Sequence, residues 1–180
     1  MKALVSTAVG GPDTLQMVDL PTPTPGKGQM LVRVIACGIN FPDVIIIEDK
    51  YQFKPPRPFA PGSEISGEIL ALGEGVAGFS VGDRIISAVG WGGLSEEMLV
   101  DADKAFRLPD GVDAAEGAGL IFTYGTNMHG LIDRARLQAG ETMLVLGAAG
   151  GIGLAAVEIG KALGARVIGA VSSEEKRAAV

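Results

Sequence analysis

The first 110 residues contain short stretches in which apolar residues alternate with polar ones or form brief continuous runs. Glycine, proline and aspartate separate these stretches, and this spacing is typical of β-strands joined by turns. Strands are therefore predicted at Lys2–Ser6, Met30–Ala36, Ile65–Leu72, Arg84–Ala88 and Glu97–Val100. The prolines of Pro21–Gly26 predict an extended connector, because each proline disfavours helix in the residue before it. A short helix is expected near Pro42, with Asn40 as its N-cap.

The pattern changes after Pro109–Gly111, where helix-forming residues without strand alternation begin. Helices are expected within Asp113–Ile121 and Thr126–Ala135. The elements predicted after them are a strand at Met143–Leu146, a helix from Ile152 to Leu163 and a strand at Arg166–Val171. Because these two strands are apolar on both faces, they are typical of a parallel sheet covered by helices. The expected fold is therefore a mostly β domain over residues 1–120, followed by the start of an α/β domain over residues 121–180.

Composition and charge narrow the class of protein. The chain has 180 residues and is 47% hydrophobic, which is enough for a packed core. Its net charge of −6 argues against nucleic acid or an anionic membrane as the main partner. One cysteine excludes an intrachain disulfide and a four-cysteine metal site. No apolar stretch is long enough to span a membrane and the N-terminus does not match a signal peptide, so a cytoplasmic setting is predicted.

The turn Gly147–Gly153 lies between a predicted strand and a predicted helix, which is the context of a dinucleotide-binding site. Gly150 would let the backbone approach a pyrophosphate, and Gly153 would let the helix pack closely on the strand. The helix N-terminus would supply amide donors. The usual G-x-G-x-x-G pattern fails at its first position, where Ala148 stands. A tight turn without a ligand is the alternative.

The end of the second α/β strand indicates which cofactor is used. Sites that prefer NAD place an acidic residue there for the ribose hydroxyls. This chain has Ser172 and Ser173, followed by Lys176 and Arg177, which suit a 2′-phosphate. Glu174–Glu175 are expected in the first turn of the next helix, facing solvent. NADPH is therefore the predicted cofactor, although the two cations could also simply belong to an exposed helix face.

Five motifs in this order resemble the medium-chain dehydrogenase/reductase superfamily, specifically its zinc-independent quinone oxidoreductase branch. They are the segments Ala36–Val44, Pro61–Gly67, Val81–Ile85, Tyr124–Thr126 and Gly147–Gly153. The resemblance implies a GroES-like β-barrel catalytic domain followed by a Rossmann domain, with the active site in the cleft between them. It also implies hydride transfer from NADPH to a quinone or another conjugated carbonyl, and a homodimer for the full-length protein.

The resemblance explains why a carboxylate, Glu64, follows Gly62 and Ser63 at the start of a predicted buried strand. Zinc-dependent relatives have a histidine ligand where Ser63 stands and a cysteine ligand where Asn40 stands. Serine and asparagine do not form the site that zinc prefers, so no metal is expected. Cys37 lies three residues before Asn40, too early to replace that ligand, and the lone His129 is expected to be a partly exposed packing residue. Glu64 is then interpreted as a structural acid, hydrogen-bonded to backbone or paired with a cation, with direct catalysis as the alternative.

By the same resemblance, Asn40 faces the nicotinamide and the substrate, where its amide would hydrogen-bond a carbonyl. The alternative is that Asn40 is only the helix cap, and the two roles are compatible. Tyr51 resembles the tyrosine that lines the quinone site, and its alternative is a loop aromatic packed on Phe53. Thr126 resembles the threonine behind the nicotinamide ring, and an ordinary helical threonine is equally compatible with the sequence. Ile45 stands where a second aromatic is often found, so a more aliphatic pocket is expected.

The predicted catalytic residues are thus Asn40 and Tyr51. The predicted cofactor-binding residues are Asn40, Thr126, Ala149, Gly150, Gly151, Ile152, Ser172, Ser173 and Lys176. The chain stops at Val180, whereas members of the resembled family are longer, so a truncated or partly recorded protein is expected. A non-catalytic remnant that binds a nucleotide or a partner is the second hypothesis.

Overall fold

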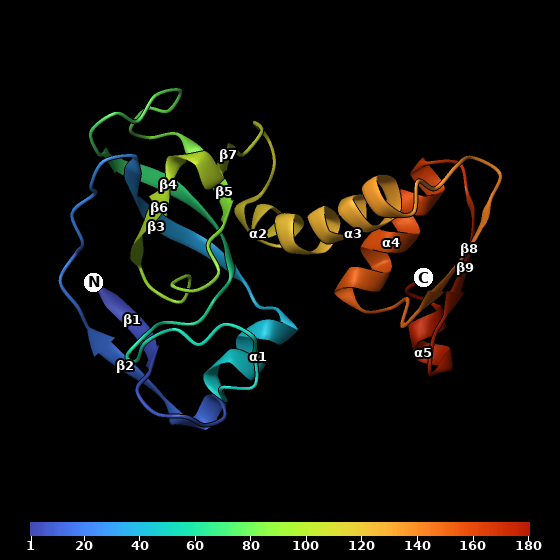
Figure 1. Cartoon of the computed structure of the whole chain (residues 1–180), viewed down its shortest axis with the longest axis horizontal. Helices are drawn as coiled ribbons and strands as arrows, with labels where there is room; N and C mark the ends of the chain where they lie inside the picture. The colour runs from blue at the N-terminus through green and yellow to red at the C-terminus, as the bar shows by residue number, and fades with distance from the viewer. The chain divides into compact units, whose positions relative to one another are not determined.

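The computed structural model describes all residues from Met1 to Val180 and divides into two units, Met1–Gly119 and Leu120–Val180. The strands of the first unit, drawn in Figure 1, are β1 (Lys2–Ser6), β2 (Leu15–Asp19), β3 (Gln29–Gly38), β4 (Glu64–Leu72), β5 (Arg84–Ala88), β6 (Glu97–Asp101) and β7 (Ala105–Arg107). Its helices are η1 (Pro12–Thr14), α1 (Phe41–Ile47), η2 (Ala102–Lys104) and α2 (Ala114–Ala118). All five strands predicted for this unit are confirmed, with ends that differ by at most two residues.

The main sheet of the first unit is antiparallel and has the order β6-β3-β4-β5-β7. Strands β1 and β2 form a separate antiparallel pair, which isolated bridges connect to Ser95 and Phe59. The sheet is therefore open, and the ring of strand pairings that a closed barrel needs is not completed. The core lies on one face of the main sheet and consists of Met30, Val32, Ile65, Ile69, Ile85, Met98 and Val100. Strand β6 shows why: its residues alternate, so that Met98 and Val100 are buried while their neighbours are half-exposed.

Helix α1 begins where the sequence predicted it, with Asn40 at the N-cap and Pro42 in the first turn. Its inner face packs Ile46 and Ile47 against Phe59 in a small second core. The loop after α1 is held by Arg57, whose guanidinium pairs with Asp49 at 2.8 Å and donates to the Ile47 carbonyl at 2.8 Å. The Arg57–Pro58 peptide bond is cis.

The second unit contains a strand–turn–helix–strand motif. Its elements are η3 (Ile121–Gly125), α3 (Thr126–Met128), η4 (His129–Arg134), β8 (Thr142–Leu146), α4 (Gly151–Ala162), β9 (Arg166–Ala170) and α5 (Glu174–Arg177). Strands β8 and β9 pair in parallel, which confirms the predicted βαβ unit. Helix α4 covers one face of this pair, where Val145, Ala148, Ala156 and Val157 form the core. Gly164, with φ of +81°, follows the end of α4 as predicted.

The segment before β8 is helical, as predicted, but much of it has the wider π-type turn. The π-type stretches are η3 and η4, and one turn of α-helix, α3, separates them. Short π-type stretches inside helices are frequent at functional sites.

Candidate functional site

In the first unit, the candidate site is built around the turn that enters β4. Gly62 has φ of +100°, a conformation that favours glycine, and an added Cβ would lie 2.6 Å from the Cys37 sulfur. Ser63 and Glu64 follow it and are almost completely buried, with 4% and 2% exposure. A buried carboxylate needs hydrogen-bond partners, because its desolvation is costly.

One partner of Glu64 is the side chain of Asn40. The Asn40 Nδ2 donates to Glu64 Oε1 at 2.9 Å, across a separation of 24 residues. The sequence interpretation of Glu64 considered only backbone groups and cations, so this amide partner is a new finding. Asn40 itself is half-buried at the start of α1, and the flanking Ile39 and Phe41 are 60% and 76% exposed. An amide held between exposed apolar side chains is suited to contact a flat ligand.

Asp43 is a buried acid that the sequence reasoning missed, although it lies in the Ala36–Val44 motif. Its carboxylate accepts hydrogen bonds from the Asn40 N–H at 2.7 Å, the Gly62 N–H at 3.2 Å and the Ser63 hydroxyl at 3.2 Å. Burial raises the pKa of Asp43 above its ordinary value, and the hydrogen bonds from Asn40, Ser63 and Gly62 partly oppose the shift. Asp43 therefore joins the start of α1 to the turn before β4. The signal that could have identified Asp43 is its spacing from Asn40, because an N-cap residue is often followed three residues later by an acid.

Cys37 lies beneath this network and is a poor candidate for a metal ligand. Burial raises the pKa of the Cys37 thiol to about 12, and the negative charges of Asp43 and Glu64 add to the shift. Zinc binds the deprotonated thiolate, which this environment strongly disfavours. In the chain, no three His, Cys, Asp or Glu side chains are grouped so that they could hold a metal ion.

Tyr51 belongs to a different cluster from Asn40. Its ring packs edge-on against Phe53, with a centroid distance of 5.8 Å, and it borders the core of Ile46, Ile47 and Phe59. This packing matches the alternative that the sequence left open for Tyr51. A role at a quinone site remains a prediction.

The candidate site of the second unit is the turn between β8 and α4. Gly147 has φ of +66° and so takes the left-handed conformation that this turn requires. Ala148, at the first position of the motif, is fully buried in the core of this unit and donates its N–H to the Ala170 carbonyl at 3.0 Å. Gly150 is the N-cap of α4, so the free amides of the first helical turn follow it directly. An added Cβ at Gly153 would lie 2.3 Å from the Gly147 carbonyl oxygen, so close packing there requires glycine.

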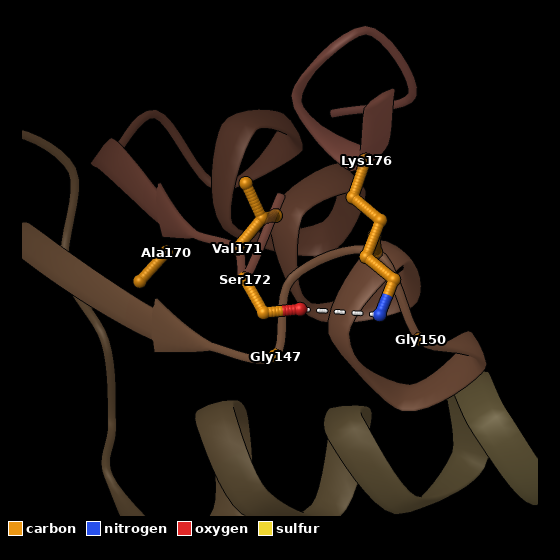
Figure 2. A pocket seen from close by; sticks show the side chains of 7 residues that line it. Gly147, Gly150, Ala170, Val171, Ser172 and Lys176 are labelled. Carbon is orange, nitrogen blue, oxygen red and sulfur yellow. Dashed lines mark hydrogen bonds between the residues drawn. The ribbon is translucent and has the colours of Figure 1, made fainter. Parts of the chain in front are cut away.

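A pocket of about 380 Å³ lies over this turn (Figure 2). Its lining residues are Gly147, Ala149, Gly150, Ala170, Val171, Ser172 and Lys176. The Lys176 side chain extends back from α5, and its Nζ donates to the Ser172 hydroxyl at 3.2 Å. The pocket thus combines the glycine turn with one hydroxyl and one cation, whereas Ser173 and Arg177, which the sequence analysis also named, do not line it.

Two of the predicted cofactor-binding residues, Ser173 and Thr126, make local hydrogen bonds, and their role in binding stays a prediction. The Ser173 hydroxyl caps α5 by accepting the Lys176 N–H at 3.4 Å. Glu174 and Glu175 lie in the first turn of α5 and are exposed, as expected. The Thr126 hydroxyl donates to the Phe122 carbonyl at 2.5 Å, and its side chain is exposed.

The helical segment before β8 contacts the N-terminal turn of α4 through residues that the sequence reasoning did not select. The buried Asn127 donates through Nδ2 to the Ile152 carbonyl at 2.8 Å and to the Thr123 carbonyl at 2.9 Å. A Cβ at Gly151 would lie 3.4 Å from the Thr123 methyl group. Thr123 therefore lies beside the glycine turn, and Asn127 holds the two segments together.

Two further polar side chains of this segment have ordinary partners. Tyr124 donates its hydroxyl to Glu158 of α4, and this hydrogen bond raises the pKa of Tyr124. His129 is 66% exposed and lies 3.0 Å from Asp133, so it decorates the helix surface and is not a packing residue. None of the helices combines the length and the apolar character that crossing a membrane requires.

Residues 26–110 match the alcohol dehydrogenase GroES-like domain family. A quinone oxidoreductase of Rattus norvegicus is 39% identical over 178 residues, which are 97% of this chain and 54% of that protein. The solved quinone oxidoreductase of Thermus thermophilus, also determined in complex with NADPH, is 36% identical with a TM-score of 0.86. That alignment covers 98% of this chain and 55% of that protein. The solved human synaptic vesicle membrane protein VAT-1 homolog-like protein is 30% identical, with a TM-score of 0.95, over 99% of this chain and 58% of that one. The chain spans about half the length of the curated relatives it matches.

Proposed function

We propose that this chain, which belongs to the medium-chain dehydrogenase/reductase superfamily and is of its quinone oxidoreductase type, serves NADPH-dependent reduction of a quinone or another conjugated carbonyl. The chemistry that the nicotinamide cofactor supplies when bound is hydride donation. The residues of this chain would bind and orient the cofactor and the acceptor. No catalytic metal is part of the proposal.

The observation that carries the proposal is the composition of the pocket over the β8–α4 turn. Backbone at Gly147 and Gly150 allows a pyrophosphate to approach closely, and the first turn of α4 offers free amides and positive potential. These are the features that a dinucleotide needs, and they come from one short stretch of chain. A turn that served only to connect β8 to α4 would not require a cation beside it.

The choice of NADPH over NADH is supported by the residues at the end of β9. No acidic side chain lines the pocket, so the usual acceptor for the ribose hydroxyls of NADH is missing there. Lys176 and Ser172 instead offer an ammonium and a hydroxyl, which suit a phosphate. Glu174 and Glu175, the nearest acids in sequence, do not line the pocket.

A metal-free reaction is supported by the hydrogen bonding in the first unit. The Ser63 hydroxyl is bound to Asp43 and the Asn40 amide to Glu64, so neither side chain is set up as a zinc ligand. A quinone does not need a dedicated acid, because the reduced oxygen can take its proton from solvent. Exposed Ile39 and Phe41 on either side of Asn40 favour a flat, apolar acceptor over a small polar one.

The test is a titration of the protein with NADPH and NADH, followed by an assay of NADPH oxidation with 1,4-benzoquinone. We expect NADPH to bind more tightly than NADH and to be oxidised only when the quinone is present. A chelator should leave the rate unchanged, and metal analysis should find no stoichiometric zinc. Binding without turnover would instead support a non-catalytic nucleotide-binding module, and one zinc per chain would contradict the metal-free mechanism.

A further inference from the structure

Asn127 is a buried amide that joins two segments of the second unit. It lies in α3 and is only 8% exposed. Its Nδ2 donates to the Thr123 carbonyl of its own segment at 2.9 Å and to the Ile152 carbonyl of α4 at 2.8 Å. Because the amide nitrogen carries two hydrogens, it can serve both carbonyls at once. One side chain therefore ties the helical segment before β8 to the first turn of α4.

The peptide group that Asn127 contacts on α4 also carries one of the amides at the start of that helix. Helix α4 begins at Gly151, so the Ile152 carbonyl lies in its first turn. The peptide bond is planar, and the Ile152 carbonyl and the Gly153 N–H therefore belong to one rigid group. The first N–H groups of a helix have no acceptor within the helix. A hydrogen bond to the Ile152 carbonyl fixes the orientation of the Gly153 N–H and polarises it, because linked hydrogen bonds strengthen one another.

A second hydrogen bond joins the same two segments but acts on a different part of α4. The Tyr124 hydroxyl donates to the side chain of Glu158, which lies beyond the first turn of the helix. This contact ends on a side chain and does not touch the peptide groups next to the glycine turn. Of the two contacts, only that of Asn127 acts directly on the amides at the start of α4.

We propose that Asn127 is a positioning residue for the dinucleotide, which holds and polarises the first turn of α4 so that its amides receive the pyrophosphate. This inference rests on the function proposed above and adds a residue that does not line the pocket over the glycine turn. NADPH and NADH both contain the pyrophosphate. Asn127 should therefore affect the two cofactors equally, whereas Lys176 is proposed to act on the 2′-phosphate alone.

Two substitutions separate the contact with α4 from the contact within the segment. Asn127→Leu has a side chain of similar size and removes both donors. Asn127→Ser keeps a donor, and a helical serine usually donates to the carbonyl four residues earlier, which is that of Thr123. Asn127→Ser is therefore expected to retain the local hydrogen bond and to lose the one to Ile152. Tyr124→Phe is the matched control, because it removes the other hydrogen bond between the same two segments.

The Kd values for NADPH, NADH and adenosine 2′-monophosphate, which has the 2′-phosphate but no pyrophosphate, test the proposal. In both Asn127 variants we expect the Kd values for NADPH and NADH to rise by the same factor, roughly 2- to 10-fold, the worth of one neutral hydrogen bond. The Kd for adenosine 2′-monophosphate should stay unchanged, and Tyr124→Phe should change none of the three. A merely structural role would weaken all three ligands together. That result, or normal dinucleotide binding by Asn127→Ser, would overturn the proposal.

An NMR measurement on the ligand-free protein tests the positioning without relying on the proposed function. The Gly153 N–H shares its peptide group with the Ile152 carbonyl, so its amide signal should shift in both Asn127 variants and not in Tyr124→Phe. An unshifted Gly153 signal in the Asn127 variants would overturn the inference, even if the parent binds NADPH. Should the parent bind neither dinucleotide, the proposed function fails separately, and the Gly153 signal still decides whether Asn127 orients this peptide group.

Discussion

Each of the two units of the chain has a candidate site of its own, and the two sites are built from different groups. In Met1–Gly119 the site consists of buried side chains, with Asp43 and Glu64 at 4% and 2% exposure holding Asn40. In Leu120–Val180 it consists of backbone at a glycine turn and of one exposed cation, Lys176. The first site depends on satisfied buried hydrogen bonds, and the second on a turn without bulky side chains beside one cation.

The cores of the two units also differ, in how completely their sheets bury apolar side chains. In the first unit, Met30 and Ile65 on neighbouring strands are fully buried by the five-stranded sheet and its connections. In the second, the two-stranded sheet leaves Leu144 and Leu146 of β8 exposed by 61% and 76%. A substitution in the first unit therefore acts by leaving buried groups unpaired, whereas one at the glycine turn acts by occupying space.

The largest effect is expected for the reactivity of Cys37, which reports how closed the interior of the first unit is. With the pKa raised from 9.0 to about 12, the thiolate fraction at pH 8 falls by roughly a thousandfold, and alkylation depends on the thiolate. Iodoacetamide labelling of the native protein, followed by mass spectrometry, should be slower than labelling in urea by about that factor. Rates within tenfold of each other would mean that the region around Cys37 is open.

The next largest effect is expected at the turn, where Gly153 and Gly150 are a matched pair. An added Cβ at Gly153 would lie 2.3 Å from the Gly147 oxygen, so Gly153→Ala should cost about 3 kcal/mol of stability, at the upper end for overpacking. At Gly150 the nearest atom is 3.4 Å away, so Gly150→Ala should fold normally and lose NADPH binding. Thermal unfolding measures the stability of both variants, and titration with NADPH measures their binding. If Gly150→Ala binds NADPH as tightly as the parent, the turn does not hold the pyrophosphate.

A smaller and pH-dependent effect is expected at Asp43. Because burial raises its pKa above 3.8, the folded state binds this proton more tightly than the unfolded state does. Its contribution to stability is present below pH 3.8 and is lost as the pH rises through the folded-state pKa. Asp43→Asn should remove that slope, and it should cost about 1–2 kcal/mol at pH 7, because the hydrogen bonds to Asn40, Gly62 and Ser63 are no longer all accepted.

Urea unfolding across pH measures this slope, and Asp83→Asn is the control with the opposite sign. Hydrogen bonds from the Ser80 N–H and Arg107 lower the pKa of Asp83. The contribution of Asp83 is therefore present above pH 3.8 and is lost as the pH falls through its folded-state pKa. If Asp43→Asn left the pH dependence of stability unchanged, the pKa of Asp43 would not be raised in the folded protein.

The elements that the sequence predicted correctly are those with a local signal. Alternating or continuous apolar runs gave β3, β4, β5 and β6 within two residues of their ends, and the glycine turn followed from its position between a strand and a helix. Strands β2 and β7 were missed. Strand β7 has three residues, and three of the five residues of β2 are exposed, so neither carries a strong hydrophobic pattern.

The contacts that define the site could not be predicted from the sequence. Asn40 and Glu64 were both selected, but their hydrogen bond joins residues 24 apart and depends on how α1 packs against β4. Asp43 was overlooked because an acid in the first turn of a helix is usually interpreted as a solvent-facing residue. The π-type turns that direct Asn127 at α4 also depend on packing that propensity does not predict.

The central claim is that the pocket over the glycine turn binds the 2′-phosphate of NADPH, and neighbouring cations on α5 test it most directly. Lys176 lines the pocket, whereas Arg177 pairs with Glu174 at 3.0 Å and does not line it. We expect Lys176→Ala to weaken NADPH binding by roughly 10- to 100-fold, the worth of a charge-assisted hydrogen bond, and to leave NADH binding nearly unchanged. Arg177→Ala should change neither Kd. Equal losses for both cofactors in Lys176→Ala, or equal effects of the two substitutions on NADPH, would contradict the claim.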